Sequence, residues 1–236
     1  MRSPSAGLFY IFCDEKYLSL EGKRQILTSY VALPQGAWKS LRYTYQRLAE
    51  PKRMSRLDRI EAVLEQTDGG AVVARIELPQ EMLPKGERDG TIDLPDMSRA
   101  DNAWGAALAF GLTAVFPLLH NLGLQVQTAD VYFDNRELKR EHIIKMKELV
   151  TTAIPKVIRA ASRVTHTIPE DRPNIRRFQG ISKPPAGREP DQFQAGLSLA
   201  HHVLQNWRLI GSRPGRRILV RDNTNQLVNY IRKFQV

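Results

Sequence analysis

The sequence predicts an α/β fold in which a mixed sheet is flanked by helices. Two observations lead to this prediction. Apolar runs of strand length, rich in aromatic and β-branched residues, recur through the 236-residue chain. Between them lie segments with apolar residues three or four positions apart, as in helices. A hydrophobic content of 42% is enough for the core of one large domain, which we expect to span residues 1–236.

The first predicted strand is Leu8-Phe9-Tyr10-Ile11-Phe12-Cys13, which is followed directly by Asp14 and Glu15. A continuous apolar run indicates a central strand that is buried on both faces. Residues 25–33 are expected to be its antiparallel partner after a turn over residues 17–23. The remaining strands are predicted at residues 71–78, 126–135 and 162–168, with a short one in the tail at residues 218–220.

Helical periodicity is expected at residues 37–49, 54–66, 98–123, 137–153 and 191–210, with a final helix to about residue 233. The first two form a helical insertion at about 37–66. Residues 98–123 are the longest apolar segment, so a membrane span has to be considered. Pro117, His120 and Asn121 favour instead a buried helix that is kinked near Pro117 and ends at Gly123.

The net charge of +10 is concentrated in the last third of the chain. From Lys156 onward there are 15 Lys and Arg residues against 5 Asp and Glu residues, whereas the two kinds balance before it. This asymmetry indicates a polyanionic partner, most often nucleic acid, although a merely basic surface is the alternative. A Pro-rich loop is predicted at about 169–190, and it holds five candidate nucleic-acid contacts: Arg172, Arg176, Arg177, Lys183 and Arg188.

Cys13 is the single cysteine, so no disulfide can form within the chain. We interpret it as a small buried apolar residue, which fits a reducing compartment. Residues 1–7 lead into no apolar signal core, because Asp14 and Glu15 interrupt the run. We therefore expect a cytoplasmic protein, and neither a membrane partner nor any particular oligomeric state is indicated.

Two predicted strands close on acidic residues, since the strand at residues 126–135 reaches Asp134 as the first reaches Asp14. If these strands lie side by side and parallel, their ends are roughly 5 Å apart. Asp14 and Asp134 could then share a divalent cation such as Mg²⁺ or Mn²⁺. Strands that simply reach solvent are the alternative. Glu15 ranks below both, because successive strand residues point to opposite faces.

Three short motifs carry a resemblance to a known family. The chain opens with Tyr10-Ile11-Phe12-Cys13-Asp14-Glu15-Lys16, has Val131-Tyr132-Phe133-Asp134 in its middle, and has Leu197-Ser198-Leu199-Ala200-His201 in its late helix. This resembles the ribonuclease H-like superfamily, and most closely domain-of-unknown-function family 3800. The resemblance implies a five-stranded mixed sheet flanked by helices, here with helical insertions and a C-terminal extension. Its first three strands would be antiparallel, and its first and fourth strands adjacent and parallel.

The late helix departs from the family pattern, which has Gln where Ser198 stands and Asp where His201 stands. At 100° per residue, His201 borders the apolar face and His202 falls toward solvent. His201 is therefore the candidate third ligand, and Mn²⁺ accepts its nitrogen better than Mg²⁺ does. An ordinary hydrogen-bonded histidine is the alternative. Asp191 is a spare carboxylate at the helix start, where a favourable N-terminal charge is the simpler interpretation.

The predicted function is that of a metal-dependent nuclease. Asp14, Asp134, Glu15 and His201 would form its catalytic group, and Asp14, Asp134, His201 and Asp191 are the candidate metal ligands. Bound ions would activate water and stabilise charge on the phosphate. No Ser-His-Asp order, phosphate-binding glycine loop or zinc-type spacing competes with this interpretation. The alternative is a catalytically degenerate module that binds nucleic acid or a protein, because His201 replaces an acid.

Overall fold

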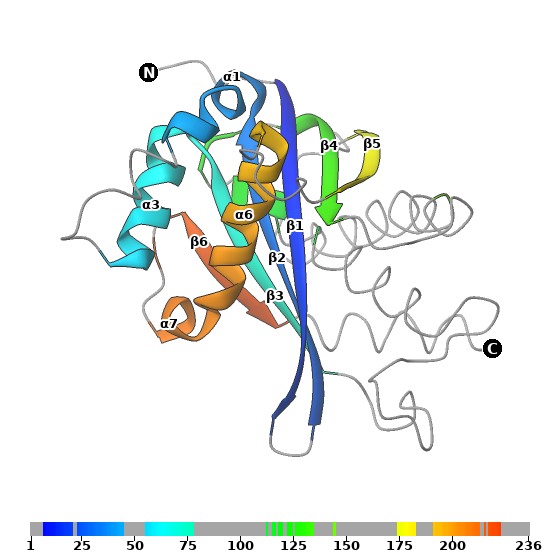
Figure 1. Ribbon diagram of the computed structural model, residues 1–236, viewed down its shortest axis with the longest axis vertical. Helices are drawn as coiled ribbons and strands as arrows, with labels where there is room; N and C mark the ends of the chain where they lie inside the picture. The colour runs from blue at the N-terminus through cyan, green and yellow to red at the C-terminus, as the bar shows by residue number, and fades with distance from the viewer. Residues whose placement is uncertain are drawn as a thin grey trace.

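A six-stranded mixed sheet forms the centre of the computed structural model (Figure 1). The structure describes residues 7–20, 23–44, 55–77, 126–134, 174–182 and 191–212, together with residues 112, 115, 116, 118, 119, 122–124, 144, 215 and 217–222. The strands are β1 (Gly7–Leu20), β2 (Lys23–Pro34), β3 (Gly70–Glu77), β4 (Val126–Asp134), β5 (Asn174–Ile181) and β6 (Ile218–Asp222). Their order in the sheet is β5-β4-β1-β2-β3-β6.

Strand directions are mixed, as the sequence predicts. β1, β2 and β3 form an antiparallel meander. β4 lies beside β1 and parallel to it, β5 is parallel to β4, and β6 is parallel to β3. The α/β class is thus confirmed. The resemblance implies five strands, and the described residues form six. The short strand predicted at residues 218–220 is present as β6 at the β3 edge.

Four helices have bounds in the described part of the chain: α1 (Gln35–Trp38), α3 (Arg56–Gln66), α6 (Gln192–Gln205) and α7 (Trp207–Ser212). Residues 41–44 are also helical. The single helix predicted over residues 191–210 is wrong in one respect, since it breaks at Asn206 into α6 and α7. The backbone N–H of Asn206 donates to the carbonyls of His202 and Val203, which ends the first helix.

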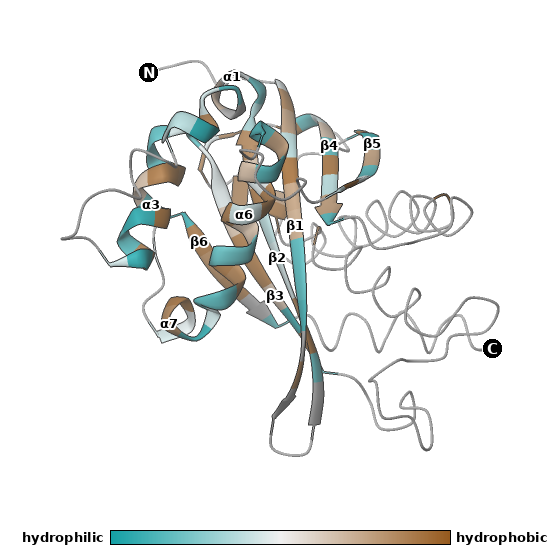
Figure 2. Ribbon diagram, in the orientation of Figure 1, coloured by the Kyte–Doolittle hydropathy of each residue, from teal (hydrophilic) through white to brown (hydrophobic). Residues whose placement is uncertain are grey.

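The two faces of the sheet bury separate apolar clusters, and β1 contributes to both. Figure 2 shows hydrophobic residues in brown along the upper part of β1. Tyr10 and Phe12 pack with α3 and α6, whereas Phe9, Ile11 and Cys13 pack on the opposite face. This alternation follows from the period of two along a strand. It explains why the run is apolar throughout, because a central strand covered on both faces has no solvent side.

Helical residues between 112 and 119 cover the second face. Gly123 has a φ of 74°, and the N–H of Leu124 donates to the carbonyl of Leu119 over 2.8 Å. This is a Schellman cap, which confirms the helix stop predicted at Gly123. In the described part of the chain, no helix is both long and apolar enough to cross a membrane.

β1 does not end at Asp14 and Glu15, and that prediction is wrong. It continues to Leu20, and its pairing with β2 extends to Leu20 and Lys23, so the turn predicted over residues 17–23 is much shorter. Only the pairing with β4 stops early, at Cys13 and Phe133. The hairpin partner satisfies the backbone of β1 beyond that point, so the strand continues although its sequence turns polar.

The predicted loop at 169–190 is also wrong in part, because residues 174–181 form β5 beside β4. Ile175 and Phe178 are buried and the intervening side chains are exposed, as an edge strand requires. The predicted strand at 162–168, the final helix to 233 and nearly all of the predicted helix at 137–153 lie outside the described residues.

Candidate functional site

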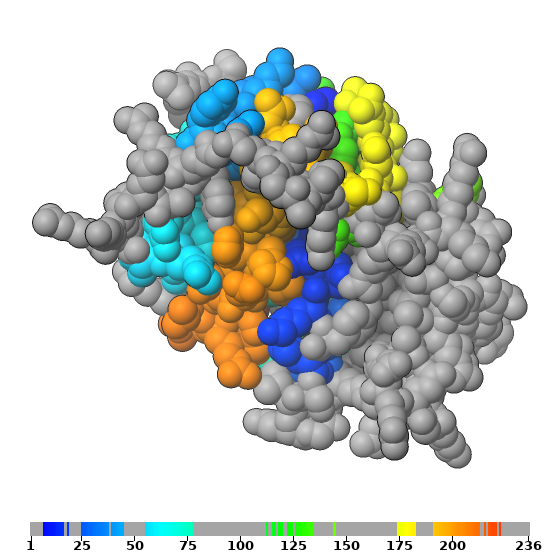
Figure 3. All heavy atoms as spheres, in the orientation of Figure 1, coloured from blue at the N-terminus to red at the C-terminus, as the bar shows by residue number. Residues whose placement is uncertain are grey.

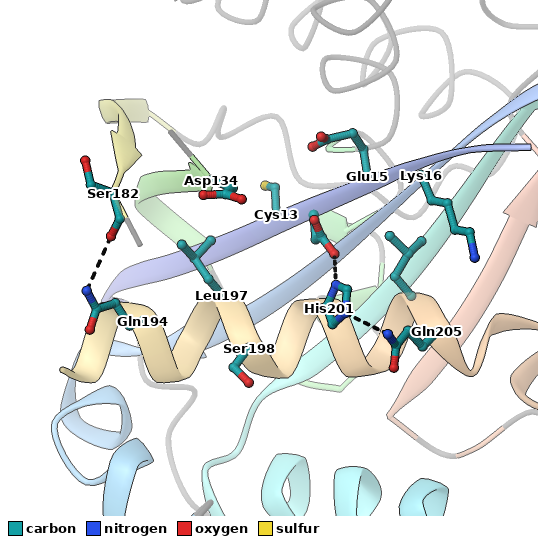
Figure 4. Close-up of a pocket in the computed structure, with 12 residues that line it drawn as sticks. Cys13, Glu15, Lys16, Asp134, Ser182, Gln194, Leu197, Ser198, His201 and Gln205 are labelled. Atoms are coloured by element: carbon teal, nitrogen blue, oxygen red, sulfur yellow. Dashed lines mark hydrogen bonds and ion pairs between the residues drawn. The ribbon is translucent and has the colours of Figure 1, made fainter. Parts of the chain in front are cut away.

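A cavity of about 580 Å³ opens where β4 ends and β1 continues (Figure 4). Four consecutive residues of β1, from Cys13 to Lys16, form one wall. Asp134 closes β4 at its edge, Ser182 follows β5, and one side of α6 forms the opposite wall. The cavity therefore collects the first strand, the middle strand and the late helix, which are the three segments that carry the sequence motifs.

Asp14 and Asp134 line this cavity from neighbouring strands. Cys13 and Phe133 are the last paired residues of β1 and β4, so the two aspartates come next at the same level, roughly 5 Å apart along the sheet. Phe12 and Tyr132 pack on the α6 face, and alternation assigns Asp14 and Asp134 to that same face. The structure thus brings the two predicted acids to one face and one edge.

His201 rises from α6 and meets Asp14. Its Nδ1 lies 2.7 Å from Oδ2 of Asp14, and its Nε2 lies 2.7 Å from Nε2 of Gln205 (Figure 4). An ionised carboxylate only accepts hydrogen bonds, so Nδ1 carries the proton and donates it to Asp14. The amide of Gln205 then donates to the lone pair on Nε2. The prediction that His201, and not His202, faces the sheet edge is confirmed, and both of its ring nitrogens are engaged.

Ser29 fixes the position of α6 over this part of β1. Its fully buried hydroxyl donates to the carbonyl of Ala200 over 2.8 Å, and a longer contact of 3.4 Å reaches the carbonyl of Asp14. Ser29 lies opposite Asp14 in the β1–β2 ladder. A single side chain therefore ties the strand that carries Asp14 to the helix residue that precedes His201.

Glu15 lines the cavity but points away from α6 (Figure 4). Successive residues of β1 face opposite sides, and this strand has not ended at Asp14. The structure therefore brings Glu15 near the site without joining it to the pair of Asp14 and His201. This agrees with its lower rank in the sequence analysis.

Asp191 lies at the N-terminus of α6, outside the cavity lining. Its carboxylate accepts from the backbone N–H of Gln194 over 2.9 Å, and the side chain of Gln194 accepts from the N–H of Asp191 over 2.8 Å. This reciprocal capping box is a complete structural role for the carboxylate. The structure does not bring Asp191 to the other candidate ligands, in contrast to its predicted place among them.

Cys13 belongs to the part of β1 that lines the cavity, but its side chain is buried in the apolar cluster on the face of the sheet away from α6. Burial raises the pKa of the Cys13 thiol well above its ordinary value, and the neighbouring charge of Asp14 raises it further. A thiol held in its protonated form is a poor nucleophile. The interpretation of Cys13 as a buried apolar residue is confirmed.

Arg176 was predicted to contact nucleic acid, but the structure gives it a different partner. Its guanidinium forms a bidentate ion pair with the fully buried carboxylate of Asp130, at 2.9 Å and 2.5 Å. A register shift in the β4–β5 ladder aims Arg176 at this acid. Arg177 is exposed on β5 and donates a hydrogen bond to Tyr132. Arg172, Lys183 and Arg188 lie outside the described residues.

Replacing Arg176 with alanine is expected to lower the free energy of unfolding, because the buried carboxylate of Asp130 would lose its partner. Adding Asp130→Asn to that variant should restore part of the loss, since the uncompensated charge is then removed. Urea denaturation of the single and double variants measures both effects, with Arg177→Ala as the control on the same strand. Equal midpoints for Arg176→Ala and Arg177→Ala would contradict the assigned role.

The prediction that His202 falls toward solvent is wrong, because this side of α6 packs beside α3 and leaves His202 half-buried near Arg56 and Arg59. Burial lowers the pKa of His202, and the positive charges of Arg56, His201 and Arg59 lower it further. Below its ordinary pKa of 6.5, the unfolded chain therefore binds more protons at this position than the folded protein does. Stability should fall as the pH drops through this window, from about 6.5 down to the lowered pKa of the folded state.

The variant His202→Gln should weaken that dependence, because glutamine does not titrate. Denaturant midpoints measured between about pH 5 and 7.5, on either side of the ordinary histidine pKa, give the slope for each protein. An equally steep slope in the variant would assign the acid sensitivity to other groups.

The sequence analysis did not identify four residues that take part in this site: Ser29, Ser182, Gln194 and Gln205. Gln205 follows His201 by four positions on one helix face, so helical spacing could have found it. Ser29 is 171 positions from its partner Ala200, and nothing local in the sequence indicates that contact. No family model matches the chain, and a search of curated proteins found no match either.

Proposed function

We propose that the chain is a divalent-metal-dependent phosphodiester hydrolase that acts on nucleic acid. The observation that carries this proposal is the pairing of β1 and β4, after which Asp14 and Asp134 follow at one level and on one face. Two carboxylates at this separation repel each other unless a cation or a proton lies between them. Their common cavity is open enough to admit a phosphate group.

The sheet topology supports the resemblance to the ribonuclease H-like superfamily. That resemblance is one basis of the predicted function. That resemblance implies three antiparallel strands, with a fourth strand adjacent and parallel to the first. The order β5-β4-β1-β2-β3 has this arrangement, and β6 extends it at the far edge. We treat membership of the superfamily as part of the proposal, since topology alone does not define function.

The donor set fits Mg²⁺ or Mn²⁺. Mg²⁺ is commonly held by one or two carboxylates, with water and substrate phosphate completing its shell, so Asp14 and Asp134 suffice on the protein side. The bound ion supplies charge stabilisation at the phosphate and lowers the pKa of bound water. Among the described residues, no three His, Cys, Asp or Glu side chains form a metal-binding group.

In this proposal His201 orients Asp14 and does not itself bind the metal. The ring donates from Nδ1 to Oδ2 of Asp14 and accepts from Gln205 at Nε2, so neither nitrogen is available without rearrangement. The hydrogen bond from His201 fixes the orientation of the Asp14 carboxylate. Hydrogen-bonded partners of metal ligands fix ligand orientation in this way.

A second candidate is the binding module without catalysis. The observation that favours it is the same hydrogen bond, because Asp14 already has a partner in His201 before any cation binds. In that case the cavity would bind nucleic acid or a protein segment without cleaving it.

A cleavage assay separates the two candidates. Labelled single-stranded and double-stranded DNA and RNA are incubated with the protein in Mg²⁺, in Mn²⁺ and in EDTA. The proposal expects cleavage of at least one substrate that depends on the metal and is lost in Asp134→Asn. Absence of cleavage from all substrates in both metals, by protein that is folded and binds them, would support the binding module and overturn the hydrolase.

A further inference from the structure

Helix α3 separates its charges onto two stripes. Asp58, Glu61 and Glu65 recur at positions three and four apart and lie on one side of the helix. Arg56 and Arg59, also three apart, lie on another side, and at 100° per residue the two stripes are about 160° apart. Such a separation gives the helix one acidic face and one basic face.

The neighbours of each stripe agree with this division. Glu61 interacts with Glu65, Asp58 and Arg217, and Arg217 belongs to the segment that leads into β6. The arginine stripe is turned toward α6, where the positive charges of Arg56 and Arg59 act on His202. Asp58 also accepts a hydrogen bond from the hydroxyl of Ser55, the N-cap of α3, at 2.6 Å.

The basic stripe is held next to α6 by packing. Ile60 and Val63 of α3 and Val203 of α6 belong to one buried cluster, so the two helices lie side by side on the same face of the sheet. Figure 3 shows α3 and α6 forming one continuous surface, with α7 below them and β1 on the other side of α6. The cavity with Asp14 and Asp134 therefore lies across α6 from the arginines.

We propose that Arg56 and Arg59 hold the phosphate backbone of a nucleic-acid strand that crosses α6 from the cavity. This inference rests on the proposed substrate, and it assigns the backbone contact to α3, where the sequence analysis expected the loop at 169–190. Arginine suits this role because its guanidinium binds phosphate through two donors at once. The exposed side of α6 that the strand would cross carries His201 and Gln205, both hydrogen-bond formers without negative charge.

The width of α6 sets the length of strand required. A helix with its side chains is about 10 Å across, which corresponds to about three nucleotides of a strand that keeps the stacked rise of about 3.4 Å per nucleotide found in duplex DNA. A strand that ends at the reactive phosphate would not reach the arginines. Binding should therefore strengthen markedly once the oligonucleotide extends about three nucleotides beyond the cleavage position.

The test measures binding of a labelled single-stranded oligonucleotide in EDTA, over a range of salt concentrations. Each lost phosphate contact should flatten the plot of log affinity against log salt by about 0.7, so Arg56→Gln/Arg59→Gln should lose about 1.4. Arg56→Lys/Arg59→Lys keeps both charges and should keep the slope. Arg75→Gln is the control, because it removes one arginine charge from β3, where Arg75 pairs with Asp222 at 2.6 Å.

A double glutamine variant that folds, as judged by circular dichroism, and keeps the wild-type slope would overturn the inference. If that variant does not fold, the single variants give the same test at about 0.7 each. The outcome is separate from the proposed function. Cleavage with an unchanged slope would reject the role of α3 and retain the proposed hydrolase. A flattened slope without cleavage would support the role of α3 and reject the hydrolase.

Discussion

Replacing Asp14 with asparagine is expected to reduce metal-dependent cleavage by about a hundredfold or more. The amide has nearly the same shape but lacks the negative charge that binds a divalent cation. Loss of a residue that only supports a metal ligand costs about 10- to 100-fold, so loss of the ligand itself should cost at least as much. Rates measured at saturating Mg²⁺ and Mn²⁺ give the comparison with the wild-type protein.

Asp191→Asn is the matched control for this prediction. It makes the same chemical change at a carboxylate that caps α6 and lies outside the cavity, and asparagine is itself a good N-cap. Its activity should stay close to that of the wild type. The double variant Asp14→Asn/Asp134→Asn should be little worse than either single variant, because residues that act as one unit are not additive. Two fully additive losses would mean that Asp14 and Asp134 do not share an ion.

The two carboxylates could be predicted because their signal is local. An apolar strand that passes abruptly into an acid marks the end of a buried stretch, and this is visible at Asp14 and at Asp134 without any tertiary information. The same signal misled the prediction of where β1 ends. The pairing with β4 does stop at Cys13, but the hairpin with β2 continues to Leu20. The change from apolar to polar residues shows where burial ends, and it does not show where strand pairing ends.

β5 could not be predicted from its own residues. Between Pro173 and Pro184 the chain is polar and basic, with Ile175 and Phe178 as its buried apolar anchors. It becomes a strand because β4 offers an open edge, and because Asp130 on β4 provides the buried partner for Arg176. Both causes lie far away in the sequence, since Asp130 and Arg176 are 46 positions apart.

The hydrogen bonds of the candidate site could not be predicted from local sequence either. Helical spacing was enough to choose His201 over His202 as the residue that faces the sheet. The partner of its Nδ1, however, is 187 positions away, and only the folded structure shows that Asp14 takes it. The sequence thus predicted that Asp14, Asp134 and His201 gather in the cavity, and the structure adds how His201 and Asp14 are joined.

The close approach of α6 to β1 depends on Gly196, and adding a methyl group there is expected to destabilise the protein. A Cβ at Gly196 would lie 2.5 Å from three carbon atoms of the Phe12 ring, which is fully buried and cannot move aside freely. Overpacking of a core costs about 1–3 kcal/mol, against a gain of at most about 1 kcal/mol from the helix propensity of alanine. Gly196→Ala should therefore lower the free energy of unfolding by about 1–2 kcal/mol.

Gly211→Ala is the matched control, because no atom lies within 4 Å of a Cβ at that helical position. Its stability should be unchanged or raised by up to about 1 kcal/mol, so the two variants should differ in sign. Urea denaturation measures both. Phe12→Leu in the Gly196→Ala background should recover part of the loss by making room for the methyl group. If Gly196→Ala is as stable as Gly211→Ala, α6 can move away from β1 at no cost. The helix would then be too loosely held to keep His201 on Asp14.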